Sequence, residues 1–268
     1  MNFVDLSKPR EWTDALRSQT KAFYVESMTN PLLQVGALDE VPAFCRSHGL
    51  VSLIDNTFAT PVNFTPLTHG FDICLHSATK YLNGHSDIVA GAIVGSGALV
   101  EKAHHRLNHL GGSLDPHACF LLQRGLKTLT LRVTRQNENA QALAEFLADR
   151  EEVERVNYPG LPDHPGYQRA KALFKGCGGV LSFELRGGER AAEAFLDRLS
   201  LPVNAASLGG VETLVTRPSR SSHSGVSREE RLKIGISDSL IRLAVGIENI
   251  DDLIEDFSRA LETREVYK

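Results

Sequence analysis

Residues 71–87 have the sequence FDICLHSATKYLNGHSD, an apolar run that gives way to hydroxyl residues and a lysine. The run contains no glycine or proline at its start, which predicts a buried strand. A second apolar run, residues 50–54, is followed by Asp55. Polar side chains that follow two buried parallel strands meet at the carboxyl edge of the sheet, where open α/β sheets bind their ligands. We therefore predict an α/β fold with a ligand site at this edge.

Composition excludes several classes of protein. Of the 268 residues, 42% are hydrophobic and 23% are charged, and the net charge is -4. Without a basic excess the chain cannot neutralise many phosphates, so we expect no nucleic-acid and no membrane partner. The chain has no apolar run of about 20 residues and no signal-peptide pattern at its amino terminus. Its four cysteines form no CxxC pair, which argues against a disulfide framework. We expect a cytoplasmic protein.

The pattern along the chain predicts two domains, residues 1–130 and 131–268. In the first, apolar strands alternate with a helix, which predicts a mostly parallel sheet covered on both faces. These strands are expected at 21–25, 50–54, 71–77 and 88–94, and the helix at 38–48. Residues 116–149 predict one long helix or two abutting ones. Beyond them, short strands mix with amphipathic helices, which predicts a smaller α+β domain. Its strands are expected at 153–158, 180–185, 213–216 and 241–245.

Lys80 and Asp55 are candidates for chemistry at the predicted sheet edge. Partial desolvation would lower the pKa of Lys80 and free its amine to form a Schiff base. The alternative is a solvated lysine with a buried stem. Asp55, at the end of an apolar strand, needs a cationic partner such as a pyridinium nitrogen. Alternatively, its side chain only forms a turn.

Two hydroxyls and an arginine are further candidates. Ser77 and Thr79 lie next to Lys80 and are suited to binding phosphate oxygens, although hydroxyls after a strand often bond the local backbone. Arg242 lies in an otherwise apolar strand and must be paired there. Its forked donors suit a substrate carboxylate, and a structural ion pair with an Asp or Glu is the alternative.

Two other chemistries match in part. Ser77 and Lys80 fit the S-x-x-K motif of penicillin-recognising enzymes, which predicts a serine acyl hydrolase. The companion motifs of that class are missing, however, and Ser77 follows a strand where the class has a helix start. His105 and His109 are four residues apart and would share a helix face. Without the glutamate of H-E-x-x-H, we expect no metal site.

Several motifs, taken together, resemble the signature of the Cys/Met-metabolism family of enzymes that depend on pyridoxal 5'-phosphate (PLP). This family includes cystathionine γ-synthase, cystathionine β- and γ-lyases, methionine γ-lyase and O-acetylhomoserine sulfhydrylase. The motifs are ESMTNP at 26–31, DNTFATP at 55–61, HSATKYLNGHSD at 76–87, SLGGVETL at 207–214 and the segment 235–248. The resemblance implies the PLP-dependent transferase-like fold (fold type I, aspartate aminotransferase fold).

The resemblance also implies roles toward the cofactor. Lys80 matches the residue that forms the internal aldimine and later moves protons at the substrate carbons. Asp55 matches the acid that keeps the pyridine nitrogen protonated. Ser77 and Thr79 match the residues that hold the cofactor phosphate, and Asn30 falls where the family approaches the ring hydroxyl and the substrate carboxylate.

On the substrate side, Arg242, with Ser207 nearby, matches the residues that bind the α-carboxylate of an amino-acid substrate. The implied reaction is trans-sulfuration chemistry, by β- or γ-elimination or γ-replacement on a sulfur amino acid or an activated homoserine. The family also implies a homo-oligomer, either a dimer or a tetramer.

The chain departs from the family pattern in two ways. Nothing before Glu26 resembles the family's amino-terminal part, which carries a phosphate loop, the aromatic residue that stacks on the ring and groups lent to a neighbouring subunit. We therefore expect an N-terminally truncated large domain with an open sheet edge. Ala206 stands where several cystathionine-processing members have glutamate, so the distal substrate pocket is expected to be less polar. The alternative function is a catalytically impaired remnant that acts as an assembly partner.

Overall fold

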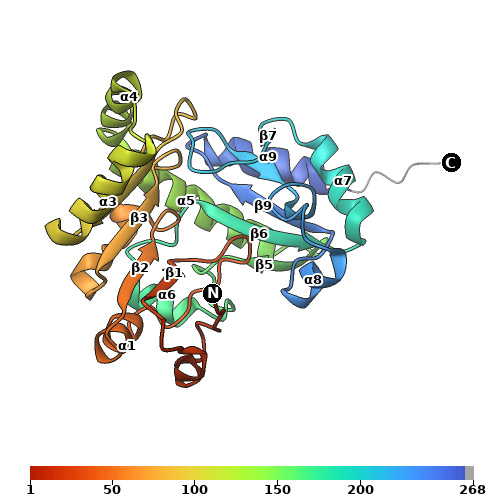
Figure 1. The fold of residues 1–268 in the computed structure, drawn as a ribbon. Helices are drawn as coiled ribbons and strands as arrows, with labels where there is room; N and C mark the ends of the chain where they lie inside the picture. The colour runs from red at the N-terminus through yellow and green to blue at the C-terminus, as the bar shows by residue number, and fades with distance from the viewer. Residues whose placement is uncertain (263–268) are drawn as a thin grey trace. The chain divides into compact units, whose positions relative to one another are not determined.

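The computed structural model describes residues 1–262, which form two compact units, each with its own β-sheet (Figure 1). Unit 1 contains residues 1–29, 34–130 and 165–177. Unit 2 contains residues 30–33, 131–164 and the described residues from 178 onward. The segments 30–33 and 165–177 thus lie in the opposite units from those that a single boundary after residue 130 would give.

The sheet of unit 1 has four strands in the order β1-β2-β3-β4. Its strands are β1 (Ala22–Glu26), β2 (Val51–Asp55), β3 (Ile73–Ser77) and β4 (Gly91–Gly95). The pairs β1–β2 and β2–β3 are parallel, and β4 runs antiparallel to β3. This sheet, with the separate α+β unit, confirms the predicted α/β class with a mostly parallel sheet.

The last strand of this sheet differs from the prediction. A strand covered on both faces was expected over 88–94, but β4 spans Gly91–Gly95 and its Ile93 and Val94 side chains are 46% and 47% exposed. A parallel partner for β3 would need a crossover connection, which is usually a helix. Residues 78–90 instead form a turn at 78–83 followed by irregular structure, so the chain reverses and β4 pairs antiparallel.

The helices of unit 1 begin where the sequence supplies a start signal. The predicted helix at 38–48 is α1 (Val41–Ser47), which has Pro42 in its first turn, where a missing N–H has no cost. Asp115 caps α4 (Pro116–Leu126) by accepting hydrogen bonds from two main-chain N–H groups. The other elements are α2 (Thr60–Asn63), α3 (Gly97–Leu110), α6 (Tyr167–Leu173) and the 3-10 helices η1 (Pro9–Ala15) and η2 (Pro66–His69).

An aromatic cluster forms part of the core of unit 1. Trp12 packs edge-on against Phe23 and Phe44, with ring centroids 5.1 and 5.4 Å away. The two phenylalanine rings lie 5.8 Å from each other. Edge-to-face packing of this kind adds to the free energy gained from burial. The cluster joins η1 to β1 and α1.

The sheet of unit 2 has five strands in the order β5-β6-β9-β8-β7. They are β5 (Val153–Asn157), β6 (Val180–Leu185), β7 (Val203–Asn204), β8 (Leu214–Thr216) and β9 (Leu240–Ala244). Its pairs are antiparallel except β7–β8. The central strand β9 is buried along its whole length, which accounts for its nearly continuous apolar sequence.

The helices of unit 2 are held by caps and by a second aromatic cluster. The side chains of Ser227 and Asn249 cap α8 (Arg228–Lys233) and α9 (Ile250–Leu261) by accepting hydrogen bonds from main-chain N–H groups. Phe195 packs edge-on against Phe183 and Phe257 at 5.7 and 5.5 Å. The remaining elements are α5 (Leu129–Ala148), α7 (Gly188–Arg198) and η3 (Pro218–Arg220). Within the described chain, no helix combines the length and apolarity needed to cross a bilayer.

Candidate active site

The candidate residues of unit 1 lie at the carboxyl ends of two adjacent strands. Asp55 is the last residue of β2, and Ser77 is the last residue of β3. The two strands pair in parallel, with Asp55 opposite Leu75. A carboxylate and a hydroxyl therefore leave the sheet at the same edge, as the sequence predicted, and Lys80 follows in the next turn.

The Asp55 carboxylate is oriented by two donors. The Thr57 N–H donates to Oδ1 at 2.9 Å, and the Tyr24 hydroxyl donates to Oδ2 at 3.4 Å. Burial, with the charges of Asp55 and Glu26, raises the pKa of Tyr24 to about 12, so at neutral pH the phenol keeps its proton and remains a donor. Sequence reasoning had assigned no role to Tyr24 or Thr57.

Lys80 lies in a turn that its own backbone closes. Its N–H donates to the Ser77 carbonyl at 3.1 Å, and its carbonyl accepts from the Gly84 N–H at 2.7 Å. The Asn83 N–H donates to the Ala78 carbonyl at 3.0 Å inside the same turn. The Lys80 side chain is half-buried. A fixed backbone restricts the positions that the amine can reach.

The two hydroxyls next to Lys80 have different surroundings. Thr79 bonds the backbone ahead of β4, because its Oγ1 accepts from the Ala90 N–H at 2.9 Å and donates to the Ala90 carbonyl at 3.2 Å. This is the local-backbone alternative that the sequence left open. The Ser77 hydroxyl has no hydrogen-bond partner among residues 1–262, while its N–H donates to the Thr57 hydroxyl at 2.8 Å.

A cysteine and a histidine of β3 are buried beneath the strand end. Cys74 Sγ lies 3.3 Å from His76 Nε2. Burial raises the pKa of the Cys74 thiol to about 12 and lowers the pKa of His76. At neutral pH both groups are therefore uncharged, and their contact belongs to the core.

The candidate residues of unit 2 gather around Arg242. This side chain is 5% exposed in the middle of β9. Its Nη1 donates to Asn30 Oδ1 at 3.2 Å, and its Nη2 donates to the Ser207 carbonyl at 2.7 Å. Both acceptors are neutral oxygens, and together they orient the guanidinium. Ser207 contributes its backbone to this contact, which residue type alone does not indicate.

The loop that carries Ser207 is held by a buried network. Ser207 itself has a φ of 119°, a conformation that is strained for a residue with a side chain. Glu248 accepts from the N–H and the hydroxyl of Thr213 at 2.5 and 2.8 Å, and Gln136 donates to the Gly210 carbonyl at 2.7 Å. These bonds hold the segment that follows Ser207 in the chain.

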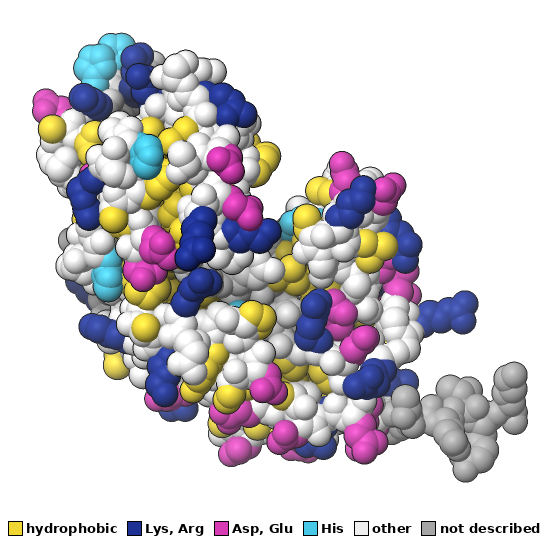
Figure 2. All heavy atoms as spheres, turned by 90° about the horizontal axis from the view of Figure 1, so that it is seen from below, with side chains coloured by type: hydrophobic (Ala, Val, Ile, Leu, Met, Phe, Trp, Pro, Cys, Tyr) yellow, Lys and Arg dark blue, Asp and Glu magenta, His cyan; other side chains and the backbone are white. Residues whose placement is uncertain are grey.

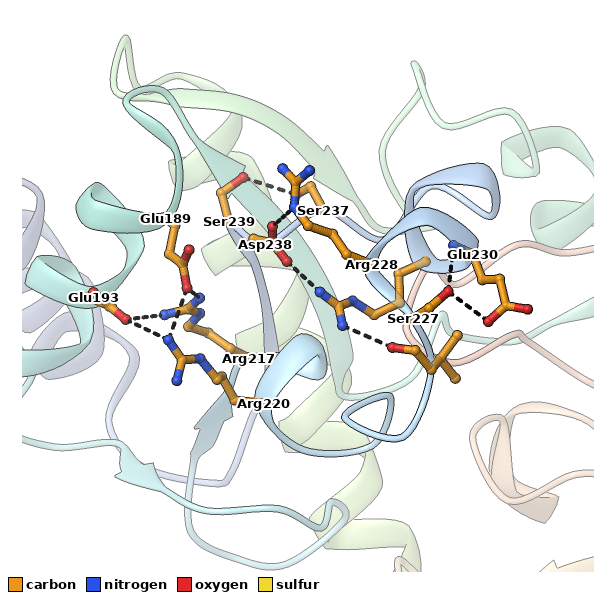
Figure 3. Close-up of polar contacts among 12 residues, drawn as sticks. Glu189, Glu193, Arg217, Arg220, Ser227, Arg228, Glu230, Ser237, Asp238 and Ser239 are labelled. Atoms are coloured by element: carbon orange, nitrogen blue, oxygen red, sulfur yellow. Dashed lines mark hydrogen bonds and ion pairs between the residues drawn. The ribbon is translucent and has the colours of Figure 1, made fainter.

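Two other polar clusters of unit 2 consist of ion pairs (Figure 3). Arg217, which directly precedes η3, has a side chain that is 5% exposed. It pairs with Glu189 and, at 2.7 Å, with Glu193. Arg220 points toward the same two carboxylates at 3.1 and 3.4 Å. The second cluster joins Asp238 to Arg228 and Arg231. The first cluster pairs two arginines with two glutamates, and in the second both arginines bind the one carboxylate of Asp238, which suits a structural role.

Of the histidines that a metal site could use, three lie on α3, and His117 lies on α4 next to its cap Asp115. His104, His105 and His109 are exposed, and His109 Nδ1 lies 2.7 Å from the His105 carbonyl. Among the described residues, no group of three or more His, Cys, Asp or Glu side chains is arranged to hold a metal ion.

Comparisons with known proteins identify relatives along almost the whole chain. The sequence model of the family described as Cys/Met metabolism PLP-dependent enzyme matches residues 1–262. The chain is 46% identical to cystathionine gamma-lyase of Bacillus subtilis over 261 residues, which make up 97% of this chain and 69% of that protein. It is 45% identical to cystathionine beta-lyase of Lactococcus lactis over 264 residues, 98% of this chain and 69% of that protein.

A solved structure is also similar to almost the whole chain. Cystathionine gamma-lyase from Lactobacillus plantarum, crystallised with L-serine, superimposes with a TM-score of 0.93 at 40% identity. The match covers 97% of this chain and 68% of that one.

Proposed function

Because the chain belongs to the family of Cys/Met metabolism PLP-dependent enzymes, we propose that it acts on a sulfur amino acid or an activated homoserine. It is a PLP-dependent enzyme of the trans-sulfuration type, and its relatives include cystathionine lyases and an L-methionine gamma-lyase. The reaction that we propose is β- or γ-elimination, or γ-replacement, at such an amino acid.

The side chains of unit 1 fit the cofactor. PLP presents an aldehyde, a ring nitrogen that binds a proton and a phosphate. The ends of β2 and β3 supply the carboxylate of Asp55 and the hydroxyl of Ser77, and the amine of Lys80 follows in the next turn. Each group of the cofactor thus has a residue of matching chemistry, and the Ser77 hydroxyl has no other partner among the described residues.

The placement of Asp55, Ser77 and Lys80 at the ends of two adjacent parallel strands is the observation that carries the proposal. When bound, PLP draws electrons from the substrate and makes its α-proton acidic. Asp55 would keep a proton on the ring nitrogen. The Lys80 amine would hold the cofactor covalently and then take and return protons at the substrate carbons. Ser77 would bind the phosphate, together with Thr79 if its hydroxyl turns from Ala90.

Unit 2 supports an amino-acid substrate. The forked guanidinium of Arg242 is positioned by hydrogen bonds to Asn30 and Ser207. A guanidinium that is fixed in a buried strand suits bidentate binding of an α-carboxylate. We propose that Arg242 binds the substrate carboxylate, and that Asn30 contributes to the same contact.

A direct experiment tests this function. The chain is incubated with PLP and then with cystathionine, methionine or O-acetylhomoserine, and 2-oxo acid and ammonia are measured. Pyruvate indicates β-elimination, and 2-oxobutyrate indicates γ-elimination. We expect turnover that Lys80→Ala abolishes, and borohydride reduction that fixes the cofactor to Lys80. A folded chain that binds PLP at a different lysine would contradict the proposal.

A second function has its own supporting observation. Unit 1 exposes large apolar side chains on β4 and α4, namely Ile93, Val94 and Phe120. Apolar side chains are also exposed among the charged ones on the face shown in Figure 2. Such surface favours association between chains, so we propose a homo-oligomer, in which this chain serves as an assembly partner if its own activity is impaired. A cytoplasmic location stays a prediction from the sequence.

A further inference from the structure

Where β2 and β3 separate, a side-chain hydroxyl replaces a backbone carbonyl as the acceptor of one hydrogen bond between the strands. The Asn56 N–H still donates to a carbonyl of β3 at 2.8 Å. In a parallel ladder, the Ser77 N–H would then donate to the Asn56 carbonyl. That carbonyl instead accepts from the Thr60 N–H at 2.9 Å. The Ser77 N–H donates to the Thr57 hydroxyl at 2.8 Å, so this hydroxyl takes the place of the carbonyl.

Thr57 contacts the other strand end through its backbone. Its N–H donates to Asp55 Oδ1 at 2.9 Å. The residue is 8% exposed, so water competes little for either bond. We propose that Thr57 is a positioning residue that fixes Asp55 and Ser77 relative to each other. The inference rests on the proposed cofactor roles of these two residues and deepens them.

The hydrogen bonds of Thr57 continue through Ser77 to the backbone of Lys80. Thr57 holds the N–H of Ser77, and the Ser77 carbonyl accepts from the Lys80 N–H at 3.1 Å. A continuous chain of hydrogen bonds therefore runs from the carboxylate of Asp55 to the turn of Lys80. Threonine suits this position because its branched side chain has few rotamers, which keeps the hydroxyl on the Ser77 N–H.

The two bonds of Thr57 can be separated by mutation. Thr57→Val keeps the main-chain N–H that binds Asp55 but leaves the Ser77 N–H without an acceptor, whereas Thr57→Ser keeps both bonds. The readout is the dissociation constant of the full chain for PLP and for pyridoxal, which lacks the phosphate, from absorbance titrations. We expect Thr57→Val to weaken PLP about tenfold, the effect of one hydrogen bond, to leave pyridoxal nearly unchanged and to be rescued by Thr57→Ser.

Controls separate positioning from folding. Thr68→Val makes the same chemical change at an exposed threonine of η2 and should alter neither constant. If Thr57→Val does not fold, Thr57→Ala removes the hydroxyl with less bulk and carries the same expectation. When Ser77 is already replaced by alanine, Thr57→Val should reduce PLP affinity less than it does in the wild-type chain. The reason is that both residues are proposed to act on the binding of the cofactor phosphate.

Three results would overturn the inference while leaving the proposed function intact. The first is an unchanged PLP affinity in Thr57→Val. The second is a loss of affinity in Thr57→Val that is equal for PLP and pyridoxal. The third is a loss of PLP affinity in Thr57→Ser as large as in Thr57→Val. Wild-type chain that binds neither compound would instead contradict the proposed function, and the inference with it.

Discussion

At the scale of single residues, Arg242 shows how a buried guanidinium is oriented. It lies in β9, and it donates to the Asn30 side-chain oxygen and to the Ser207 carbonyl. A buried guanidinium gains most from a partner that accepts two parallel hydrogen bonds. In the substrate role that we propose for Arg242, Asn30 and Ser207 would fix the plane of the guanidinium.

Replacing Arg242 by lysine tests this link. Arg242→Lys keeps the charge but loses the planar fork, so we expect KM for the amino-acid substrate to rise by about tenfold or more while kcat changes less. Steady-state kinetics measure both constants. Arg155→Lys, at an exposed arginine of β5 that pairs with Glu184, is the control. A fall in kcat with unchanged KM would show that Arg242 does not act in substrate binding.

His76 predicts a pH dependence of stability in unit 1. Burial lowers its pKa from the ordinary value of 6.5, although the charge of Asp55 opposes this shift. As the pH falls below 6.5, the unfolded chain gains a proton on this histidine before the folded chain does, so the free energy of unfolding decreases. The contribution is fully present above pH 6.5.

The measurement compares wild type with His76→Gln by urea unfolding at pH 7.5 and 5.5. Wild type should lose more stability between these values than the variant, by at most about 1.4 kcal/mol. His105→Gln, at an exposed histidine of α3, should behave as wild type. An identical pH dependence in wild type and His76→Gln would contradict the assignment.

At the scale of elements, α4 packs against the turn that carries Lys80. A Cβ on Gly125 would lie 2.2 Å from the Asn83 carbonyl oxygen, so only glycine permits this approach of helix to turn. Through this contact, α4 packs on the backbone of the turn at Asn83. A helix without obvious chemistry thus helps to determine where the amine lies.

Gly125→Ala is expected to displace this turn. The clash with backbone should lower the free energy of unfolding by about 1–3 kcal/mol and weaken PLP binding. Urea unfolding and absorbance titration measure the two effects. Gly97→Ala is the matched control on α3, where an added Cβ meets no atom within 4 Å. Unchanged PLP affinity in Gly125→Ala would show that α4 does not position the turn.

At the scale of the whole molecule, the exposed apolar surface of unit 1 predicts self-association. Residues 97–110 form a helix with no fully buried side chain, and Ile93 and Phe120 are 46% and 57% exposed. Association between copies would remove such surface from water. The chain's net charge of -4 is small enough to permit contact between copies.

Charged substitutions test the association. Sedimentation velocity should show that Ile93→Lys and Phe120→Glu each shift the chain toward smaller species, because each places a charge in the contact. Leu67→Lys, at a leucine of η2 that is 37% exposed, should leave the distribution unchanged. A wild-type chain that is monomeric at high concentration would contradict the homo-oligomer.

Local sequence patterns were sufficient for the strands β1, β2, β3, β5, β6, β8 and β9 and for the fold class. Hydrophobic periodicity and capping residues act within one turn or one strand, so they can be recognised without tertiary contacts. The resemblance to the family predicted PLP as cofactor. The roles assigned to individual site residues stay predictions, which the experiments above test.

Contacts between distant segments decided the rest. They turned β4 back antiparallel to β3, engaged Thr79 with Ala90, gave Arg242 the Ser207 carbonyl as a partner, and put the Thr57 hydroxyl in place of a carbonyl. The residues next to these contacts in the sequence do not predict them. In each case a donor or acceptor meets its partner on another segment only after folding, and a buried polar group must be paired wherever its partner lies.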